Sequence, residues 1–255
     1  MRLAFLVLAL AATNGALAQT PRADAPVDLT GHWVSVVTED WAWRMRTPPK
    51  GDYASLPLNA EGIRVADTWT EDRDGSCLAF GAAAVLRMPT RVRIDWQGDD
   101  TLKLDTDNGE QTRRLHFGPA DGGRAAASAV SARSTQLPRS LQGDSRAEWQ
   151  IATVVTGSGA DSGVVSTRLD EDRWAPLKVT TTNMQAAWLR PNGVPYSENA
   201  TLTEFFDAFA DGDDEWFTVT TIVEDSTYLT EPLVISSNFK REPDGSRWRP
   251  APCGE

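Results

Sequence analysis

The sequence predicts an all-β protein in which about nine or ten antiparallel strands curl into a barrel. Apolar and polar residues alternate with a period of two in short segments that recur from the middle of the chain to its end. Turn residues separate these segments, and only one stretch carries a helical pattern. Two packed sheets could also bury one apolar face, but the succession of hairpins favours the barrel.

The first elements of the chain are a strand and a short helix. Residues 31–39 are predicted to form the first strand, and residues 58–69 the only helix. Asn59 can cap this helix, with Ile63 and Ala66 on successive turns of one face.

A three-stranded meander is predicted next. In residues 90–97 apolar residues alternate with charged ones, so one face of this strand is expected to be buried. Strands follow at 101–106 and 111–117. The Asn108-Gly109 pair predicts a type I′ turn between them, because both central residues of that turn need positive φ.

The second half of the chain begins with a change of composition. Residues 119–141 are rich in Ala, Gly, Ser and Arg without periodicity, which predicts a mobile loop. Alternation then returns in a series of further predicted strands, at 147–156, 164–169, 176–183, 200–209, 215–224 and 233–241.

The first eighteen residues have the pattern of a secretory signal peptide. Arg2 precedes an apolar run at 3–12, and Ala16-Leu17-Ala18 forms a small-x-small cleavage site. The run is too short to span a bilayer, and no cysteine follows to carry a lipid. We therefore expect residues 19–255 to form one barrel domain, periplasmic or secreted, with no membrane insertion.

The composition of the chain limits which classes of binding partner and which kinds of catalytic site are expected. The chain has 36 acidic and 25 basic residues and a net charge of -11, which disfavours nucleic acid as a partner. It contains no paired-histidine zinc helix, Cys-x-x-Cys, phosphate-binding glycine loop or Gly-x-Ser-x-Gly elbow. No metal and no cofactor are therefore expected.

Cys77 and Cys253 are the only cysteines. Because thiols tend to pair in an oxidising compartment, we predict one disulfide that ties the C-terminal tail to an early loop. The alternative is two unpaired buried cysteines.

The segment Gly31-His32-Trp33 resembles the Gly-x-Trp signature of lipocalin-like calycin barrels. In that family the tryptophan plugs the closed end of the barrel and a late-strand arginine packs over it. The resemblance implies this structural role for Trp33, with Arg241 or Arg247 as its partner. The alternative is that Trp33 is an ordinary core aromatic.

A wider resemblance covers most of the mature chain. The segments at 47–53, 192–197 and 223–232 are similar to segments of exported bacterial hypothetical proteins with lipocalin-like character. That family has no established activity, so the resemblance implies a fold but no reaction. Ser226 stands where the family usually has proline, a change expected to affect only a turn.

The leading functional hypothesis is the binding of a small, mostly apolar or amphipathic molecule in a barrel cavity. Ten tryptophans favour an aromatic-lined pocket. The candidate ligand contacts combine an aromatic and cationic N-terminal cluster, one polar strand face and two tyrosines near loops: Arg44, Tyr53, Arg114, His116, Tyr196 and Tyr228.

The alternative hypothesis is an exported isomerase, lyase or hydrolase that needs no cofactor. His116 is its candidate catalytic base, since only one other histidine exists, and an arginine would stabilise developing negative charge. Arg114 and His116 share a strand face, which can line a cavity or meet water. A purely structural or partner-binding module is the third hypothesis.

Overall fold

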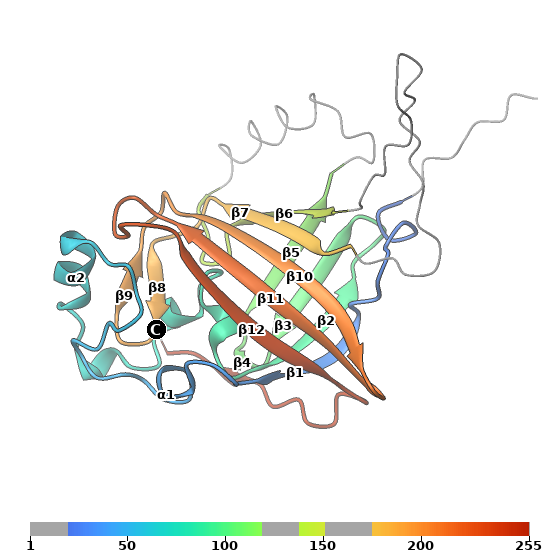
Figure 1. The fold of residues 1–255 in the computed structure, drawn as a ribbon, viewed down its shortest axis with the longest axis horizontal. Helices are drawn as coiled ribbons and strands as arrows, with labels where there is room; N and C mark the ends of the chain where they lie inside the picture. Colours follow the sequence, from blue (N-terminus) through green and yellow to red (C-terminus); the bar gives the residue numbers. More distant parts are fainter. Residues whose placement is uncertain (1–19, 119–137, 151–174, 255) are drawn as a thin grey trace, which may run out of the picture.

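The strands of this protein close into a nine-stranded barrel (Figure 1). The computed structural model describes residues 20–118, 138–150 and 175–254. Around the barrel the strands follow one another in the order β1 (Gly31–Val36), β12 (Leu233–Glu242), β11 (Asp214–Glu224), β10 (Thr201–Asp211), β7 (Leu177–Thr182), β6 (Asp144–Trp149), β5 (Thr112–Phe117), β3 (Thr101–Thr106) and β2 (Arg91–Trp96). The predicted all-β barrel is confirmed, and the two-sheet alternative is wrong.

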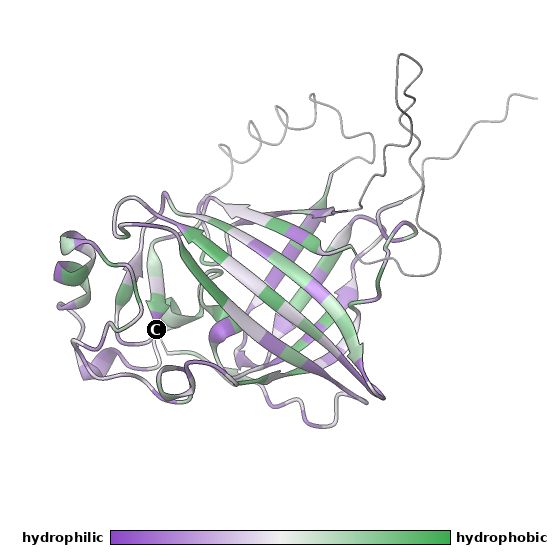
Figure 2. Cartoon of the chain, in the orientation of Figure 1, coloured by the Kyte–Doolittle hydropathy of each residue, from purple (hydrophilic) through white to green (hydrophobic). Residues whose placement is uncertain are grey.

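Alternation along the strands separates a buried inner face from a polar outer face. In β11, Phe217, Val219 and Val223 are buried while their neighbours are partly exposed. Figure 2 shows hydrophobic and hydrophilic segments alternating along β10, β11 and β12. Most apolar residues inside the barrel form one cluster that also includes Val85 and Leu86 from a covering segment, whereas Leu202, Val223 and Leu233 pack in a second cluster.

Within the barrel, one strand pair departs from the predicted antiparallel pattern. β5 and β6 run parallel, with Leu115 opposite Ser145 and Phe117 opposite Ala147. A parallel pair needs a connection of about a dozen residues or more to bring the chain back. The stretch from 118 to 143 is long enough to do so.

The turn between β3 and β5 also differs from the prediction. Positive φ falls on Gly109 and Glu110 rather than on Asn108 and Gly109. The short strand β4 (Asn108–Gly109) is held extended by a parallel pairing with β13 (Ala251–Pro252). A type I′ turn at this site is therefore wrong, because tertiary pairing determines the conformation of Asn108.

The predicted helix is present as α2 (Ala60–Ala66), and the Asn59 side chain accepts a hydrogen bond of 2.9 Å from the Gly62 amide. Several short helical turns were not predicted, because each is too brief to show a period: α1 (Trp41–Arg44), η1 (Glu71–Arg73), η2 (Cys77–Phe80) and η3 (Val85–Arg87).

A hairpin outside the barrel, β8 (Ala187–Arg190) and β9 (Val194–Tyr196), lies with α1 and α2 at the left end of the molecule in Figure 1. Nearby, Cys77 and Cys253 form the predicted disulfide, which joins η2 to the C-terminal tail. No helix in the described part of the chain is long and apolar enough to cross a membrane.

Trp33 lies inside the barrel, where its ring meets Phe217 edge-on at 4.7 Å between centroids. Of the two arginines that the resemblance implied, Arg241 packs over the Trp33 ring, with its Cζ 4.2 Å from the centroid. Arg241 also donates hydrogen bonds to the carbonyl oxygens of Thr30 and Asp28. The start of β1 is thereby fixed to the end of β12.

Some predictions fall outside the described residues. These are the signal peptide at 1–18, most of the loop at 119–141, the strand at 164–169 and the end of the strand at 147–156.

Candidate functional site

A groove of about 660 Å³ runs along the outside of the barrel beside β1. Alternation turns Trp33 inward, and Val34 and Val36 on the opposite face line the groove. We call this feature the outer groove and define it by its lining: apolar Val34, Val36, Val37, Met45, Pro89 and Ala251, with polar or charged Ser35, Thr90, Arg91, Asp107, Asn108 and Arg249.

Asp107 anchors one wall of the outer groove. Its buried carboxylate accepts hydrogen bonds from the Arg91 amide at 2.7 Å and from the Thr90 hydroxyl at 3.0 Å. Its backbone carbonyl accepts a bond of 2.8 Å from the Ala251 amide. Asp107 therefore joins the start of β2 to the C-terminal tail, and its carboxylate has a structural role.

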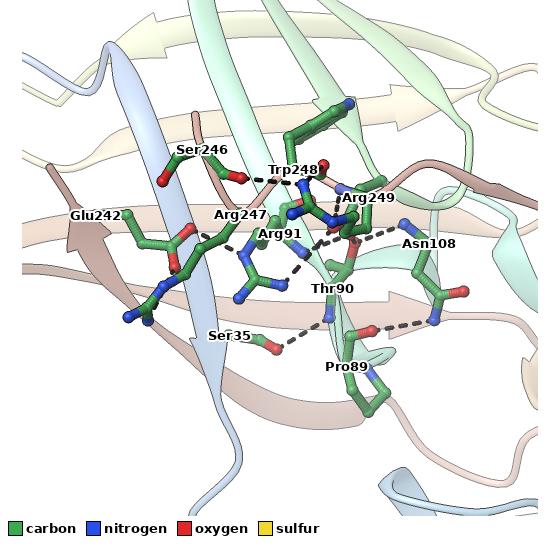
Figure 3. Close-up of polar contacts among 11 residues, drawn as sticks. Ser35, Pro89, Thr90, Arg91, Asn108, Glu242, Ser246, Arg247, Trp248 and Arg249 are labelled. Carbon is green, nitrogen blue, oxygen red and sulfur yellow. Dashed lines mark hydrogen bonds and ion pairs between the residues drawn. The ribbon is translucent and has the colours of Figure 1, made fainter. Parts of the chain in front are cut away.

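Arg91 occupies the centre of this polar network (Figure 3). Its Nε donates to Glu242 at 2.9 Å, and its Nη1 lies 3.9 Å from Asp107. Arg247 reaches the same Glu242 at 3.8 Å. Because the carboxylates of Glu242 and Asp107 both neutralise Arg91, its side chain is held in place and offers little charge to a ligand.

Arg249 is the cation in the outer groove that no carboxylate neutralises. Its guanidinium donates to the carbonyl oxygens of Ser246 and Trp248, at 2.9 Å and 2.8 Å, and forms no ion pair with any residue the structure describes (Figure 3). Met45 is 59% exposed and supplies an apolar surface in the same groove. The groove thus combines apolar contact area with one available positive charge.

The structure places Arg114 and His116 on the outer face of β5, since Arg113, Leu115 and Phe117 are the buried residues of that strand. Of the two alternatives for this strand face, the structure therefore supports the one in which it points away from the barrel interior. Arg114 is exposed and donates to the side-chain oxygen of Gln97 at 3.1 Å.

His116 lies 3.1 Å from the Thr101 hydroxyl through its Nδ1. Burial and, after it, the nearby Arg146 lower the pKa of His116 below its usual value, which favours the neutral ring. In the described parts of the chain no carboxylate or tyrosine hydrogen-bonds to this ring. The described residues therefore provide no carboxylate or tyrosine that would orient this ring as a general base.

Arg44 and Tyr53 have structural partners. Arg44 is buried and donates through Nε to the Arg87 carbonyl at 2.9 Å. The Tyr53 hydroxyl donates to Asp67 at 2.8 Å. Burial, with the Asp67 carboxylate as a further cause, raises the pKa of Tyr53 to about 12.

The other two tyrosines, Tyr196 and Tyr228, also have structural surroundings. Tyr196 is fully buried with its hydroxyl directed at Gly81, where a Cβ would meet it at 2.1 Å, and burial raises its pKa. Tyr228 lies beside the start of α2, where its backbone carbonyl accepts a hydrogen bond from the Asn59 amide. Of the six residues predicted to contact a ligand, Tyr53 and Tyr196 pack on the same hydrophobic cluster, whereas Arg114 and His116 lie on the outer face of β5.

No sequence pattern indicated the residues that form the outer groove. Arg249 lies in an irregular tail, and Met45 follows a single helical turn, so no periodicity pointed to either residue. No group of metal-ligating side chains occurs among the residues at 20–118, 138–150 and 175–254.

The fold and the groove define a nine-stranded barrel protein with an amphipathic surface groove. No family model, no curated protein and no solved structure matches the chain. Its function is therefore inferred from its own residues and their geometry.

Proposed function

We propose that this chain is an exported, lipocalin-like binding protein that holds a small amphipathic anion in the outer groove. One observation carries the proposal: the unneutralised guanidinium of Arg249 borders a groove whose lining includes Val34, Val36 and the exposed Met45. Its volume of about 660 Å³ suits a small-molecule ligand. The apolar part of the ligand would cover the aliphatic side chains, and its anionic end would pair with Arg249.

The outer groove has more support than the barrel interior as the binding region. Trp33, Phe206, Phe217 and Phe239 fill the inside of the barrel with contacting rings. Leu86 and its neighbour Val85 pack onto this cluster from the covering segment. A ligand inside would have to displace these side chains, whereas the outer groove is already formed.

Export is part of the proposal. The Cys77–Cys253 disulfide supports it, because structural disulfides persist mainly in oxidising compartments. The signal-peptide pattern of residues 1–18 supports it independently. The mass of the exported protein is expected to correspond to a chain that starts at Gln19, and an uncleaved mass would contradict this assignment.

The binding test uses anilinonaphthalene sulfonate as a fluorescent probe, displaced by dodecanoate, by neutral dodecanol or by cationic dodecyltrimethylammonium. We expect dodecanoate to compete best, because it alone offers both a chain and a carboxylate. The variant R249Q should weaken dodecanoate by about 10-fold and leave dodecanol unchanged, since a charge-assisted bond contributes about 1.5 kcal/mol or more.

R64Q is the matched control, because Arg64 is an exposed arginine on α2 whose ion-pair partner among the described residues is Glu61. It should bind dodecanoate like the wild type. Absence of saturable binding, or an equal loss in R249Q and R64Q, would overturn the proposal.

A further inference from the structure

Three arginines from distant parts of the chain surround one small cavity. Arg44 ends α1, Arg87 ends η3 and Arg190 ends β8, and all three line the cavity together with Trp43 and Leu189. The cavity volume of about 10 Å³ is close to what one water-sized particle needs.

Two of these guanidinium groups have buried nitrogens without a hydrogen-bond partner. They are Nη2 of Arg44 and Nη1 of Arg190. Arg190 is only 6% exposed, and its side chain forms neither an ion pair nor a hydrogen bond with any residue in the described ranges. The Arg190 guanidinium instead forms a cation–π contact with the Trp43 ring, whose centroid lies 5.1 Å from the Arg190 Cζ.

The nearby carboxylates already have partners. Glu39 pairs with Arg44 at 3.0 Å, and Asp40 pairs with Arg87 at 2.6 Å. Asp52 accepts a bond of 2.8 Å from the Trp43 indole.

These carboxylates also lie nearer the solvent. The side chains of Glu39 and Asp40 are 33% and 30% exposed, against 2% for Arg44 and 10% for Arg87. Three carboxylates balance three guanidinium groups in number, but the groups that line the cavity are the cationic ones.

An unpaired guanidinium group is costly to bury. Burial is the main cause that lowers the pKa of Arg44 and of Arg190, and the charge of Arg87 lowers both further. An anion between the three groups would accept the missing hydrogen bonds and reduce their mutual repulsion.

We propose that this cavity binds a single monovalent anion of about the size of chloride. The small cavity volume favours one monatomic anion, and the sign follows from the three arginine side chains that line the cavity and from the two buried guanidinium nitrogens without a partner. The anion connects α1, η3 and β8. Arg87 extends this connection to the barrel, because its Nη1 donates to the Ser236 carbonyl in β12 at 3.2 Å. The stability of the protein therefore depends on halide, independently of ligand binding in the outer groove.

Thermal unfolding in sodium chloride and in sodium gluconate, at equal sodium concentrations, tests this dependence. Chloride should raise the Tm of the wild type by about 3 °C or more over gluconate between about 5 mM and about 200 mM, with saturation. R190Q should lose this difference and R64Q should keep it. Equal responses of wild type and R190Q, or a larger rise with sodium phosphate than with chloride, would overturn the proposal.

A direct measurement covers the case in which R190Q fails to fold. Crystals of the wild-type protein soaked in sodium bromide should give an anomalous peak between Arg44, Arg87 and Arg190. Absence of this peak, with bromide found only at surface positions, would overturn the site.

Discussion

Arg113 and Glu204 form a bidentate salt bridge inside the barrel, where each side chain is only 1% exposed. The pair joins β5 to β10 across the interior. Arg113 also donates to the Thr181 hydroxyl at 3.3 Å, and the Thr181 and Ser145 hydroxyls share a hydrogen bond of 2.7 Å. The apolar interior therefore contains one polar layer whose members depend on one another.

The first prediction concerns this salt bridge. Glu204→Gln should lower the free energy of unfolding by about 3–5 kcal/mol, because it leaves the Arg113 charge buried without a counter-charge. Urea denaturation measures the loss.

The double variant R113M/E204L is the control, since it removes both charges and keeps apolar volume. Its free energy of unfolding should fall much less than that of E204Q, because replacing a buried ion pair by packed apolar residues often leaves stability unchanged. If the double variant lost as much as E204Q or more, uncompensated charge would not be the cause.

The second prediction concerns Gly31, which precedes Trp33 in β1. Its φ is 116°, and an added Cβ would lie 2.5 Å from Nη1 of Arg241. Gly31→Ala should therefore displace Arg241 from the Trp33 ring and lower the free energy of unfolding by about 2 kcal/mol or more, from strain and lost contacts. Thermal unfolding and near-ultraviolet circular dichroism of the tryptophans measure both effects.

Gly118→Ala is the matched control, because no atom of a described residue lies within 4 Å of a Cβ added there and its φ is not positive. Its effect should stay within about 0.5 kcal/mol. Equal effects of the two substitutions would show that the position of Arg241 does not require Gly31.

Alternation was enough to predict most of the barrel strands. The strands predicted at 90–97 and 215–224 correspond to β2 and β11, because each strand has one more buried and one more exposed face. β8 and β9 escaped prediction for the opposite reason. All their residues are buried, so these short strands show no alternation.

The candidate site was harder to predict than the fold. Arg114 and His116 attracted attention as a polar pair, while Arg113 shares the inner face with Leu115. Nothing local shows that Arg113 meets Glu204, which lies 91 residues further along the chain. Long-range pairing likewise brings together Arg44, Arg87 and Arg190, so only the tertiary structure could indicate an anion site.

The third prediction concerns the pH dependence of stability. Burial alone would raise the pKa of Asp105, but hydrogen bonds from Lys103, Arg93 and Thr112 outweigh it and hold the pKa below its ordinary value. Lys103 and Arg93 donate at 2.7 Å and 2.8 Å to the same carboxylate oxygen. Asp105 therefore stabilises the folded protein above the unfolded-state pKa of about 3.9, and this contribution is lost as the pH falls through the lower folded pKa.

Asp105→Asn should accordingly lower the Tm at pH 7, and the difference from the wild type should shrink as the solution is acidified below about pH 4. Tm measured against pH for both proteins tests this, with Asp99→Asn as the control, because Asp99 is exposed at a turn. D99N should follow the wild-type curve throughout. A deficit in D105N that stays constant down to about pH 2 would mean that packing, and not the charge of Asp105, causes the loss.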